Sequence, residues 1–499
     1  MSKIEFRNLT FAYDGQVAPI FDRANLIIDS DWKLGLIGRN GRGKTTLLRI
    51  LQGQVEFSGE IIGAQDFVYF PQAVRDPQQL TSYALQELAE YEEWKLEREL
   101  TLLGVDLDVL WRPFATLSGG EKTKVLLSLL FVDENNFPLI DEPTNHLDVK
   151  GREQVAEYLR RKKQGFIVVS HDRHFVDEVV DHVVSINKAQ IQLYQGNFST
   201  FDEQKKLQDS FELEQDVKLR GEISRLKKTA SDKHDWSLGR EGDNYGNPNI
   251  KGSGGTGHDG FTAARAARMM KKSKVLERRM NNEIEEKEKL LKDLEFVDPL
   301  KINFQPSHHH NLINCENVEL SYDGTPLFQP LTFKVNKGER VVIKGANGTG
   351  KSSLIKYLIN EFDGDSKGEI FIPKGIKISY VRQEYEDNRG TLREFAELKK
   401  LDYEQFLSNL KKLGMERAVF NTPIEQMSMG QQKKVELAKS LAEPAELYIW
   451  DEPLNYLDVI NHEQIEELIN KFEPSMLIIE HDLAFIENIG AEVIELKRN

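Results

Sequence analysis

Short runs of apolar and β-branched residues recur along this chain, and longer amphipathic stretches separate them. The clearest runs cover residues 34–37, 166–169, 341–343 and 476–479. Runs of this length predict buried strands, and the stretches between them predict crossover helices. The alternation therefore predicts an α/β fold with parallel sheets, in which ligands bind at the carboxyl ends of the strands.

The middle of the chain has a different pattern, in which apolar residues recur at helical spacing among many charges. A first stripe contains Phe201, Leu207, Phe211, Leu219, Ile223 and Leu226, and a second, after Phe261, contains Leu276, Met280, Ile284, Leu291 and Leu294. Such narrow stripes predict an antiparallel pair of long helices. Between them, residues 237–260 include eight glycines in 24 positions, so we expect a mobile tip there. Helices of about 35 residues would carry this tip roughly 50 Å outwards.

The two ends of the chain are repeats of each other. GRNGRGKTT at residues 38–46 returns as GANGTGKSS at 345–353, and four further motifs return in the same order at offsets of 310 or 311 residues. These are YFPQ and YVRQ, LSGGEK and MSMGQQ, LIDEPTNHLD and IWDEPLNYLD, and VVSHD and IIEHD. A shared order at a nearly constant offset indicates a duplicated domain. We therefore expect a first domain over residues 1–200, a helical linker over 201–300 and a second domain over 301–499.

Composition narrows the class of protein. Apolar residues make up 39% and charged residues 29%, as in ordinary globular proteins. The longest apolar run, residues 125–132, is far shorter than the roughly 20 residues of a membrane helix. We expect no signal peptide, because no apolar core follows the single early lysine at the N-terminus. The single cysteine, Cys315, excludes an internal disulfide, fits a reducing cytoplasm and is expected to be a small buried side chain.

Charge is distributed unevenly. The net charge is −15, but residues 221–280 contain 13 Lys+Arg against seven Asp+Glu, a local charge of +6. The rest of the chain then carries −21. Any contact with RNA is therefore expected within this one segment.

The glycine-rich motifs carry the strongest chemical signal. Glycines let the backbone wrap phosphates, so that N–H groups and a helix N-terminus face the negative charge. Lys44 and Lys351 are expected to reach the β- and γ-phosphates of ATP, and Thr45 and Ser352 to ligate Mg²⁺. The other phosphate-binding candidates are Gly38, Asn40, Gly41, Gly43 and Thr46 in the first motif, and Gly345, Asn347, Gly348, Gly350 and Ser353 in the second.

Acidic pairs follow two further apolar strands. Asp141 and Asp451 are the candidate Mg²⁺ holders, and Glu142 and Glu452 are the candidate general bases that polarise the attacking water. Such a pair could instead only cap the next helix. The remaining catalytic candidates are His171 and His481, expected at the γ-phosphate, and Gln72 and Gln383, expected to sense Mg²⁺ or water unless they are solvated surface residues.

In this order, the motifs resemble ATP-binding-cassette proteins, and the resemblance covers both halves. In that family the signature of one half completes the ATP site of the other, in a head-to-tail arrangement. The resemblance implies one site with Lys44, Gln72, Asp141, Glu142 and His171 together with Ser428, Gly430 and Gln431. It implies a second with Lys351, Gln383, Asp451, Glu452 and His481 together with Ser118, Gly119 and Gly120. Tyr13 and Tyr322 match the family's adenine-stacking aromatic, although core tyrosines on strands are the alternative.

The second half departs from the family pattern at two motifs. Met429 stands where the family usually has glycine, and Leu454 and Tyr456 replace threonine and histidine. Because Met429 removes a position of free backbone approach, we hypothesise slower hydrolysis at the site that contains Lys44.

A tandem pair without membrane segments, joined by a long helical linker, is similar to the ABC-F branch, whose members bind ribosomes. Gln72 to Ser118 spans 46 residues and Gln383 to Ser428 spans 45, so the extra arm of housekeeping members is absent. The opening half, from FAYDGQ through WKLGLIGRNGRGKTTLL, together with SMGQQKK in the second half, looks closest to Lsa-type resistance proteins. Those proteins protect ribosomes against lincosamides, pleuromutilins and streptogramin A. The resemblance implies a cytoplasmic monomer, without a permease subunit, whose linker enters the ribosomal tRNA exit site beside the P-site tRNA.

The linker also supplies candidate RNA contacts. Basic residues on its descending helix would neutralise phosphates, and aromatic residues near the tip could stack on bases. The candidates are Trp236, Tyr245, Lys251, His258, Phe261, Arg265, Arg268, Lys271 and Lys272, continued by Lys274, Arg278 and Arg279. A solvated charged helix and simple helix packing of the aromatic residues are the alternatives.

Three other functions compete with ribosome protection. A housekeeping translation factor is the nearest. The ATPase subunit of an exporter would need a coupling surface between Gln72 and Ser118 and would leave the linker unexplained. A DNA-repair ATPase would need zinc-binding cysteines, which one cysteine cannot supply.

Overall fold

The computed structural model describes residues 3–13, 19–63, 65–145, 147–187, 189–211 and 298–498, with residues 214, 217–218, 221–225, 228, 278–279 and 282–283 between them. The chain divides into two compact units, Met1–Phe201 with Val297–Asn499, and Asp202–Phe296. The first unit contains both repeats, which we call the first half (up to Phe201) and the second half (from residue 298).

In the first half the strands are β1 Lys3–Phe11, β2 Phe21–Asp29, β3 Lys33–Ile37, β4 Ser58–Ile62, β5 Asp66–Phe70, β6 Asn136–Asp141, β7 Phe166–Val169, β8 His182–Asn187 and β9 Gln190–Gln195. Its helices are α1 Lys44–Leu51, α2 Thr81–Gln86, α3 Glu93–Leu102, α4 Gly119–Leu130, α5 Val149–Arg161 and α6 Arg173–Val179, with short 3-10 helices at Leu107–Trp111 and Phe114–Thr116.

In the second half the strands are β10 Asn311–Tyr322, β11 Thr325–Pro326, β12 Leu331–Asn336, β13 Arg340–Lys344, β14 Asp365–Phe371, β15 Ile378–Val381, β16 Leu447–Asp451, β17 Met476–Ile479 and β18 Glu492–Glu495. Its helices are α9 Lys351–Leu358, α10 Leu392–Leu398, α11 Tyr403–Lys412, α12 Met429–Ala442, α13 Val459–Phe472 and α14 Leu483–Asn488, with 3-10 helices at Arg417–Asn421 and Ile424–Gln426.

Each half is built on a mainly parallel sheet, which confirms the predicted α/β class. The order is β5-β6-β7-β3-β8-β9 in the first half and β15-β16-β17-β13-β18 in the second, as traced through the described residues. Neighbouring strands run parallel except β9, which pairs antiparallel with β8. All four apolar runs identified from the sequence form strands of these two sheets.

Helices cover both faces of each sheet, so that successive residues of a strand enter different cores. In the first half Leu139 packs in the core that includes Leu47 of α1, whereas the next residue, Ile140, packs in the core that includes Val125 of α4 and Val155 of α5. A strand buried on both faces is apolar at every position, which explains the continuous runs in the sequence. This arrangement brings the carboxyl ends of the strands to one edge, where the motif residues lie.

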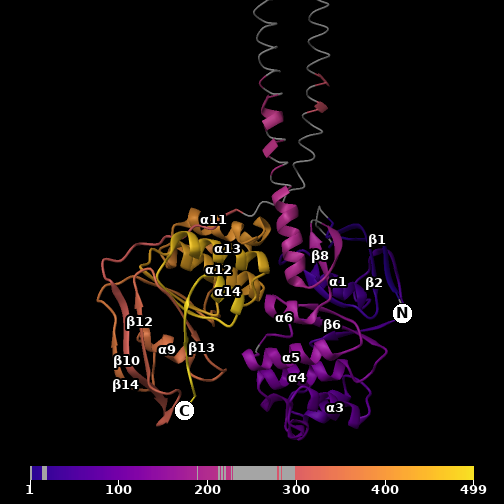
Figure 1. Cartoon of the computed structure of the whole chain (residues 1–499), viewed down its shortest axis with the longest axis horizontal. Coiled ribbons are helices and arrows are strands. Elements are labelled where there is room, and N and C mark those ends of the chain that lie inside the picture. The colour runs from indigo at the N-terminus through magenta and orange to yellow at the C-terminus, as the bar shows by residue number, and fades with distance from the viewer. Residues whose placement is uncertain are drawn as a thin grey trace, which may run out of the picture. The chain divides into compact units, whose positions relative to one another are not determined.

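Each half also contains a second, antiparallel sheet, which was not predicted from the sequence. It consists of β2-β1-β4 in the first half, and of β10 with β11, β12 and β14 in the second, where β10, β12 and β14 run side by side (Figure 1). In β1 the buried residues Ile4 and Phe6 alternate, but the register shifts between Phe6 and Leu9 and interrupts the pattern. Cys315 lies on β10 and is fully buried, as expected.

Asp202–Phe296 contains the predicted linker, of which the structure describes a part. Residues 202–211 are helical, and so are Arg278 and Arg279, which are exposed. Ile223 is buried, whereas Leu207 and Phe211 are exposed, so the described part of the first stripe is only partly buried. The tip at 237–260 and the second stripe lie outside the described residues. Across the part of the chain described here, no helix has the length and apolarity needed to cross a membrane.

Candidate nucleotide sites

Two glycine-rich loops connect a central strand to a helix in each half. The first joins β3 to α1 and the second joins β13 to α9. Gly43 and Gly350 adopt positive φ angles of 98° and 86° directly before these helices. A Cβ atom on Gly43 would lie 2.4 Å from Cγ2 of Ile20, so both conformation and space require glycine there.

The two loop lysines are buried within their own loops. Lys44 Nζ donates to the carbonyl oxygen of Gly38 at 2.6 Å and to Asn40 Oδ1 at 3.3 Å. Lys351 Nζ donates to the carbonyl oxygens of Gly345 at 2.9 Å and Ala346 at 3.0 Å. Burial lowers the pKa of both ammonium groups. Each lysine is therefore held where a phosphate anion can replace backbone carbonyls as its partner.

The acidic pairs stand at the ends of β6 and β16. Glu142 and Glu452 have positive φ angles of 54° and 46°, so each chain turns sharply after the strand. Burial, followed by the charge of Asp141, raises the pKa of Glu142 to about 8. Burial, followed by the charge of Glu452, raises the pKa of Asp451 to about 6. Buried carboxylates with raised pKa values of this kind are typical of catalytic sites.

Both candidate histidines lie beside their sites and are neutral. His171 Nε2 is 3.4 Å from Glu142 Oε1, and burial lowers the pKa of His171 well below its ordinary value. Burial and the nearby Lys351 lower the pKa of His481 to about 3. Both ring nitrogens of His481 are buried without a hydrogen-bond partner. A neutral imidazole can still donate one hydrogen bond to a phosphate oxygen.

The two candidate glutamines differ. Gln383 Nε2 donates to Glu452 Oε2 at 3.0 Å, and Gln383 Oε1 accepts from Ser352 Oγ at 3.4 Å. Gln72 Oε1, by contrast, is buried without a hydrogen-bond partner. Gln383 thus joins the phosphate loop to the candidate base of the second half, and Gln72 does not do so in the first.

The signature serines cap the helices that follow them. Ser118 Oγ accepts from Glu121 N at the start of α4, and Ser428 Oγ accepts from Gln431 N at the start of α12. In both turns the side-chain oxygen at the third helical position accepts a hydrogen bond from the serine N–H. These capping boxes stabilise the helix N-termini, whose positive dipole ends favour a phosphate.

A cavity of about 460 Å³ surrounds Lys44, and residues of both halves line it. We call it the Lys44 site. Among the predicted site residues its lining contains Asn40, Gly41, Lys44, Thr45, Asp141, Glu142, His171, Ser428, Gly430 and Gln431. Tyr13, Gly38, Gly43, Thr46 and Gln72 are not part of that lining. The first phosphate loop and the second signature therefore meet in one cavity.

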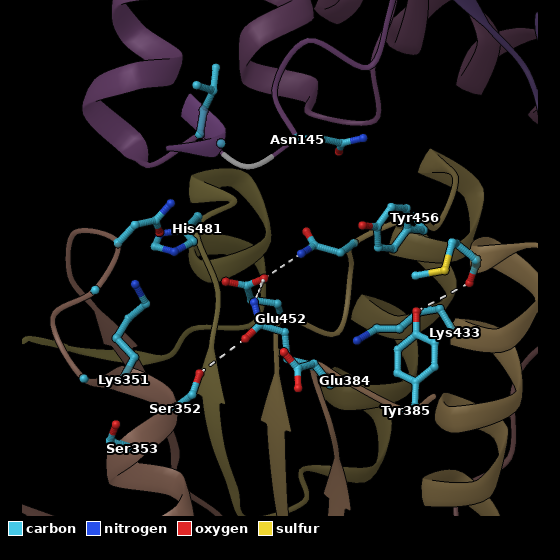
Figure 2. Close-up of a pocket in the computed structure, with 18 of the residues that line it drawn as sticks. Asn145, Lys351, Ser352, Ser353, Glu384, Tyr385, Lys433, Glu452, Tyr456 and His481 are labelled. Atoms are coloured by element: carbon cyan, nitrogen blue, oxygen red, sulfur yellow. Dashed lines mark hydrogen bonds between the residues drawn. The ribbon is translucent and has the colours of Figure 1, made fainter. Parts of the chain in front are cut away.

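A larger cavity, of about 770 Å³, surrounds Lys351 (Figure 2). We call it the Lys351 site. Among the predicted site residues its lining contains Gly119, Tyr322, Asn347, Gly348, Gly350, Lys351, Ser352, Ser353, Gln383, Glu452 and His481. Ser118, Gly120, Gly345 and Asp451 are not part of it. The first half contributes Gly119, Asn145, Leu147 and Arg152 to this lining.

The tyrosine alternatives can be separated. Tyr13 is 39% exposed and Tyr322 is 37% exposed, so neither is a core residue and that alternative was wrong. Tyr322 lines the Lys351 site. The hydroxyl of Tyr13 makes a 3.0 Å hydrogen bond with Oγ1 of Thr46 and its ring packs against Phe11.

The side chain of Met429 is placed differently from the sequence hypothesis. Met429 is half exposed and lines the Lys351 site, whereas Ser428 and Gly430 line the Lys44 site. The close approach occurs at Gly430, where a Cβ atom would meet the carbonyl oxygen of Tyr456 at 3.0 Å. Met429 therefore gives no steric reason for slower hydrolysis at the Lys44 site.

Sequence reasoning missed several lining residues. Asn145 lines both cavities, Arg152 and Lys433 line the Lys351 site, and Lys434 lines the Lys44 site. A signal existed for Asn145, because Asn455 repeats it in the second half. Lys433 and Lys434 follow the second signature directly, but their inward direction depends on the helix phase of α12.

The donor sets fit a nucleotide with its magnesium ion. Both oxygens of Asp451 are buried without a hydrogen-bond partner, and Oε1 of Glu142 makes no hydrogen bond although it lies 3.4 Å from Nε2 of the neutral His171. Unpaired carboxylate oxygens and a loop hydroxyl are the ligands that Mg²⁺ requires, and the buried lysine beside them is the cation that a polyphosphate requires. The described residues contain no cluster of three or more histidine, cysteine or acidic side chains that would hold a metal by themselves.

The nine candidate RNA contacts cannot be placed. Trp236, Tyr245, Lys251, His258, Phe261, Arg265, Arg268, Lys271 and Lys272 all lie outside the described residues.

Comparison with known proteins identifies relatives of the whole chain. Residues 21–145 and 328–455 match the family described as ABC transporter. Ribosome protection protein VmlR of Bacillus subtilis (strain 168) is 26% identical over 494 residues, covering 98% of this chain and 86% of VmlR. ATP-binding protein Uup of Escherichia coli (strain K12) is 27% identical over 540 residues, covering 95% of this chain and 77% of Uup. The solved structure of an RNase-L inhibitor superimposes with a TM-score of 0.64 at 19% identity, covering 98% and 87% of the two chains, and supports the fold.

Proposed function

Because this chain belongs to the ATP-binding-cassette family, has ABC-F proteins as its relatives and hydrolyses ATP, we propose that it is a ribosome-protecting ATPase. It binds bacterial ribosomes in the cytoplasm as a monomer without a permease. Its linker enters the tRNA exit site beside the P-site tRNA and relieves inhibition by lincosamides, pleuromutilins and streptogramin A, as in Lsa-type proteins.

The observation that carries this proposal is that each cavity is lined by both halves. Ser428 and Gly430 of the second half face Lys44, and Gly119 of the first half lines the Lys351 site. A ligand that contacts both halves favours their closed arrangement by its differential affinity for that state. ATP therefore holds the halves together, and hydrolysis releases them. Such a switch suits a protein that must bind a large target and then leave it.

The residues of each site divide the reaction between them. Lys44 and Lys351 bind the β- and γ-phosphates, and Glu142 and Glu452 orient the attacking water and accept its proton. His171 and His481, both neutral, donate a hydrogen bond to the γ-phosphate. Thr45 and Asp141 would hold the magnesium ion at the Lys44 site, and Ser352, Gln383 and Asp451 would hold it at the Lys351 site. When bound, Mg²⁺ neutralises charge that develops on the phosphates.

Charge and a relative's function support the ribosomal target. VmlR is described as a ribosome protection protein. Residues 221–280 carry +6 in a chain of net charge −15, as expected of a segment that contacts RNA phosphates. The nine linker candidates from Trp236 to Lys272 supply these contacts.

Trapping the closed state tests the ribosomal target. The Glu142→Gln, Glu452→Gln double variant binds ATP without hydrolysing it, so it is expected to co-sediment with 70S ribosomes in ATP and not in ADP. The matched control adds Lys44→Ala and Lys351→Ala, which remove the phosphate contacts and are expected to abolish co-sedimentation. A trapped double variant that remains in the supernatant would refute the proposal.

Drug susceptibility separates protection from a housekeeping role in translation. Expression of the chain in a susceptible host is expected to raise the inhibitory concentration of a lincosamide, and the Glu142→Gln, Glu452→Gln variant is not. Charge removal at Arg265, Arg268, Lys271 and Lys272 is expected to abolish resistance while ATPase activity remains. A growth defect without any drug phenotype would favour the housekeeping function.

One observation favours the exporter alternative. Tyr83, Trp94 and Trp111 lie between Gln72 and Ser118 and are 56%, 55% and 71% exposed. This is the region where an exporter ATPase needs a coupling surface. Association with the membrane fraction and drug efflux, both lost on Trp94→Ala and Trp111→Ala substitution, would support it over ribosome protection.

A further inference from the structure

A buried charged stripe runs along one side of helix α12 in the second half. Lys433, Glu436 and Lys439 follow each other at intervals of three residues, which places them on one face of the helix. Glu436 is fully buried and the two lysines are nearly so. Charged side chains occupy buried positions only when they are paired, so this face needs partners from the neighbouring strands.

Arg382 is the main partner, and it directly precedes Gln383. Its Nε donates to Glu436 Oε1 at 3.2 Å, and its two other nitrogens donate to both oxygens of Asp387 at 2.8 Å and to Asn388 Oδ1 at 2.7 Å. Asn388 Nδ2 in turn donates to Glu436 Oε2 at 2.8 Å. The loop that carries Gln383 is thus attached to α12 through a closed network.

The lysines of the stripe extend the network to the strand ends. Lys439 Nζ donates to Glu436 Oε1 at 2.6 Å and to the carbonyl oxygen of Tyr380 in β15 at 3.0 Å. Lys433 Nζ donates to the carbonyl oxygens of Arg382 and Asp451, each at 3.4 Å. Paired with Lys439 and Arg382, Glu436 has a pKa lowered to about 2, so the network stays charged at neutral pH. Breaking one of these buried ion pairs would leave a buried charge without a partner, which is costly. The network therefore resists movement of α12 relative to the loop that carries Gln383.

The described residues of the first half contain no equivalent of this network. By the repeat offsets, Pro71 takes the place of Arg382, Thr123 that of Lys433, Leu126 that of Glu436 and Leu129 that of Lys439. Leu126 and Leu129 pack in an apolar core with Phe70. Apolar contacts are not directional, so α4 can shift against Phe70 more easily than α12 can shift within its network of ion pairs.

The two glutamines differ in the same sense. Gln383, next to Arg382, contacts both Ser352 and Glu452 in the Lys351 site. Gln72, next to Pro71, has an unpaired buried Oε1 and does not line the Lys44 site. The glutamine attached to a signature helix is therefore the one engaged with its phosphate loop and base.

Helix α12 connects this network to the other site. Its N-terminal residues Ser428, Gly430 and Gln431 line the Lys44 site, whereas Gln383 lines the Lys351 site. We propose that Arg382 and Glu436 are positioning residues through which ATP at the Lys351 site sets the signature residues that assist hydrolysis at the Lys44 site. Pro71 and Leu126 stand at the positions of Arg382 and Glu436 in the first half, so the first signature lacks this connection to the Lys44 site. The coupling concerns ATP hydrolysis alone and does not depend on the ribosomal target.

Turnover at one site with the other filled or empty measures this coupling. In Glu452→Gln the Lys351 site binds ATP without hydrolysis, and in Lys351→Ala it stays empty, so the ratio of the two rates reports how the Lys351 site affects the Lys44 site. We expect a ratio of about 10, within the usual range of allosteric coupling. The mirror ratio, from Glu142→Gln and Lys44→Ala, is expected to be smaller, because it reports closure of the two halves without the added effect of the network on α12.

The Arg382→Met, Glu436→Leu pair removes both charges together and gives α12 the leucine of the first half. It is expected to reduce the first ratio to the value of the mirror ratio and to leave the mirror ratio unchanged. Arg389→Gln removes an exposed charge from the same loop and serves as the control with an unchanged ratio. If the paired variant does not fold, Arg382→Gln and Arg382→Lys replace it, with loss expected only for glutamine. An unchanged ratio in a folded charge-removing variant, or an equal fall in both ratios, would overturn the proposal.

Discussion

The backbone N–H of Asn40 in the first phosphate loop donates a 2.9 Å hydrogen bond to Oδ2 of Asp458 in the second half. The other oxygen of Asp458 accepts from Asn461 N and caps helix α13. Lys434 Nζ lies 4.0 Å from Oδ2, and both side chains are almost fully buried. One carboxylate thus connects a helix start, a buried cation and the phosphate loop of the other half.

Replacing Asp458 by alanine is expected to destabilise the protein strongly. Loss of the cap alone costs about 1 kcal/mol, whereas leaving Lys434 buried without its partner costs about 3–5 kcal/mol. The matched variant is Asp148→Ala, which removes the equivalent cap of α5 from a less buried position. Urea unfolding of the two variants should therefore differ by several kcal/mol, and equal losses would show that the buried pair contributes nothing.

The signature of the second half gives a prediction about backbone approach. Gly430→Ala places a Cβ atom 3.0 Å from the carbonyl oxygen of Tyr456, which accepts a hydrogen bond from Asn40 of the first phosphate loop, so this contact must shift by a few tenths of an ångström. We expect turnover at the Lys44 site, measured in the Glu452→Gln background, to fall by about tenfold, because catalysis depends steeply on the positions of the groups around the phosphates. Met429→Gly should leave that turnover within about twofold because its side chain lines the other cavity. A specific rise on Met429→Gly would restore the hypothesis drawn from the sequence.

Repetition and strand-end chemistry made most of the fold and much of the two sites predictable. A P-loop lysine and an acidic pair lie where strands end, and strand ends can be recognised as apolar runs. The antiparallel sheets were not predicted because β1 shifts register between Phe6 and Leu9, which hides its alternation. The inward direction of Lys433 and Glu436 was hidden too, since a charged stripe on a helix ordinarily faces solvent and only tertiary packing reverses it.

The raised pKa of Glu142 predicts how the Lys44 site responds to pH. A general base acts in its deprotonated form, and burial beside Asp141 places the pKa of Glu142 at about 8. In the Glu452→Gln background, kcat/KM should therefore rise about tenfold per pH unit up to about pH 8 and then level off. The kcat profile should level off at lower pH, because a bound cation favours the carboxylate. This step should vanish in Glu142→Gln, and a flat kcat/KM between pH 6.5 and 8.5 would exclude Glu142 as the base.

The raised pKa of a second buried carboxylate, Glu480, predicts how the free energy of unfolding depends on pH. In the first half Thr144 and Ser170 share a hydrogen bond of 3.1 Å, whereas in the second half Leu454 and Glu480 occupy these positions. Glu480 accepts from the N–H groups of His481 at 2.7 Å and Leu454 at 3.4 Å. Burial nevertheless raises the pKa of Glu480 to about 7 from an ordinary value of 4.5.

The sign of the pH dependence follows from proton counting. Between pH 4.5 and 7 the folded chain binds more protons at Glu480 than the unfolded chain, so stability falls as pH rises through this window. Glu480→Gln keeps the shape and an acceptor oxygen without the charge. Relative to wild type, this variant should gain about 3 kcal/mol in the free energy of unfolding between pH 4.5 and pH 8. Ser170→Ala serves as the matched control, with an offset that does not change with pH. If the free energies of unfolding of wild type and Glu480→Gln run parallel with pH, Glu480 is already ionised in the folded protein. The titration of Glu480 would then make no contribution to the pH dependence of stability.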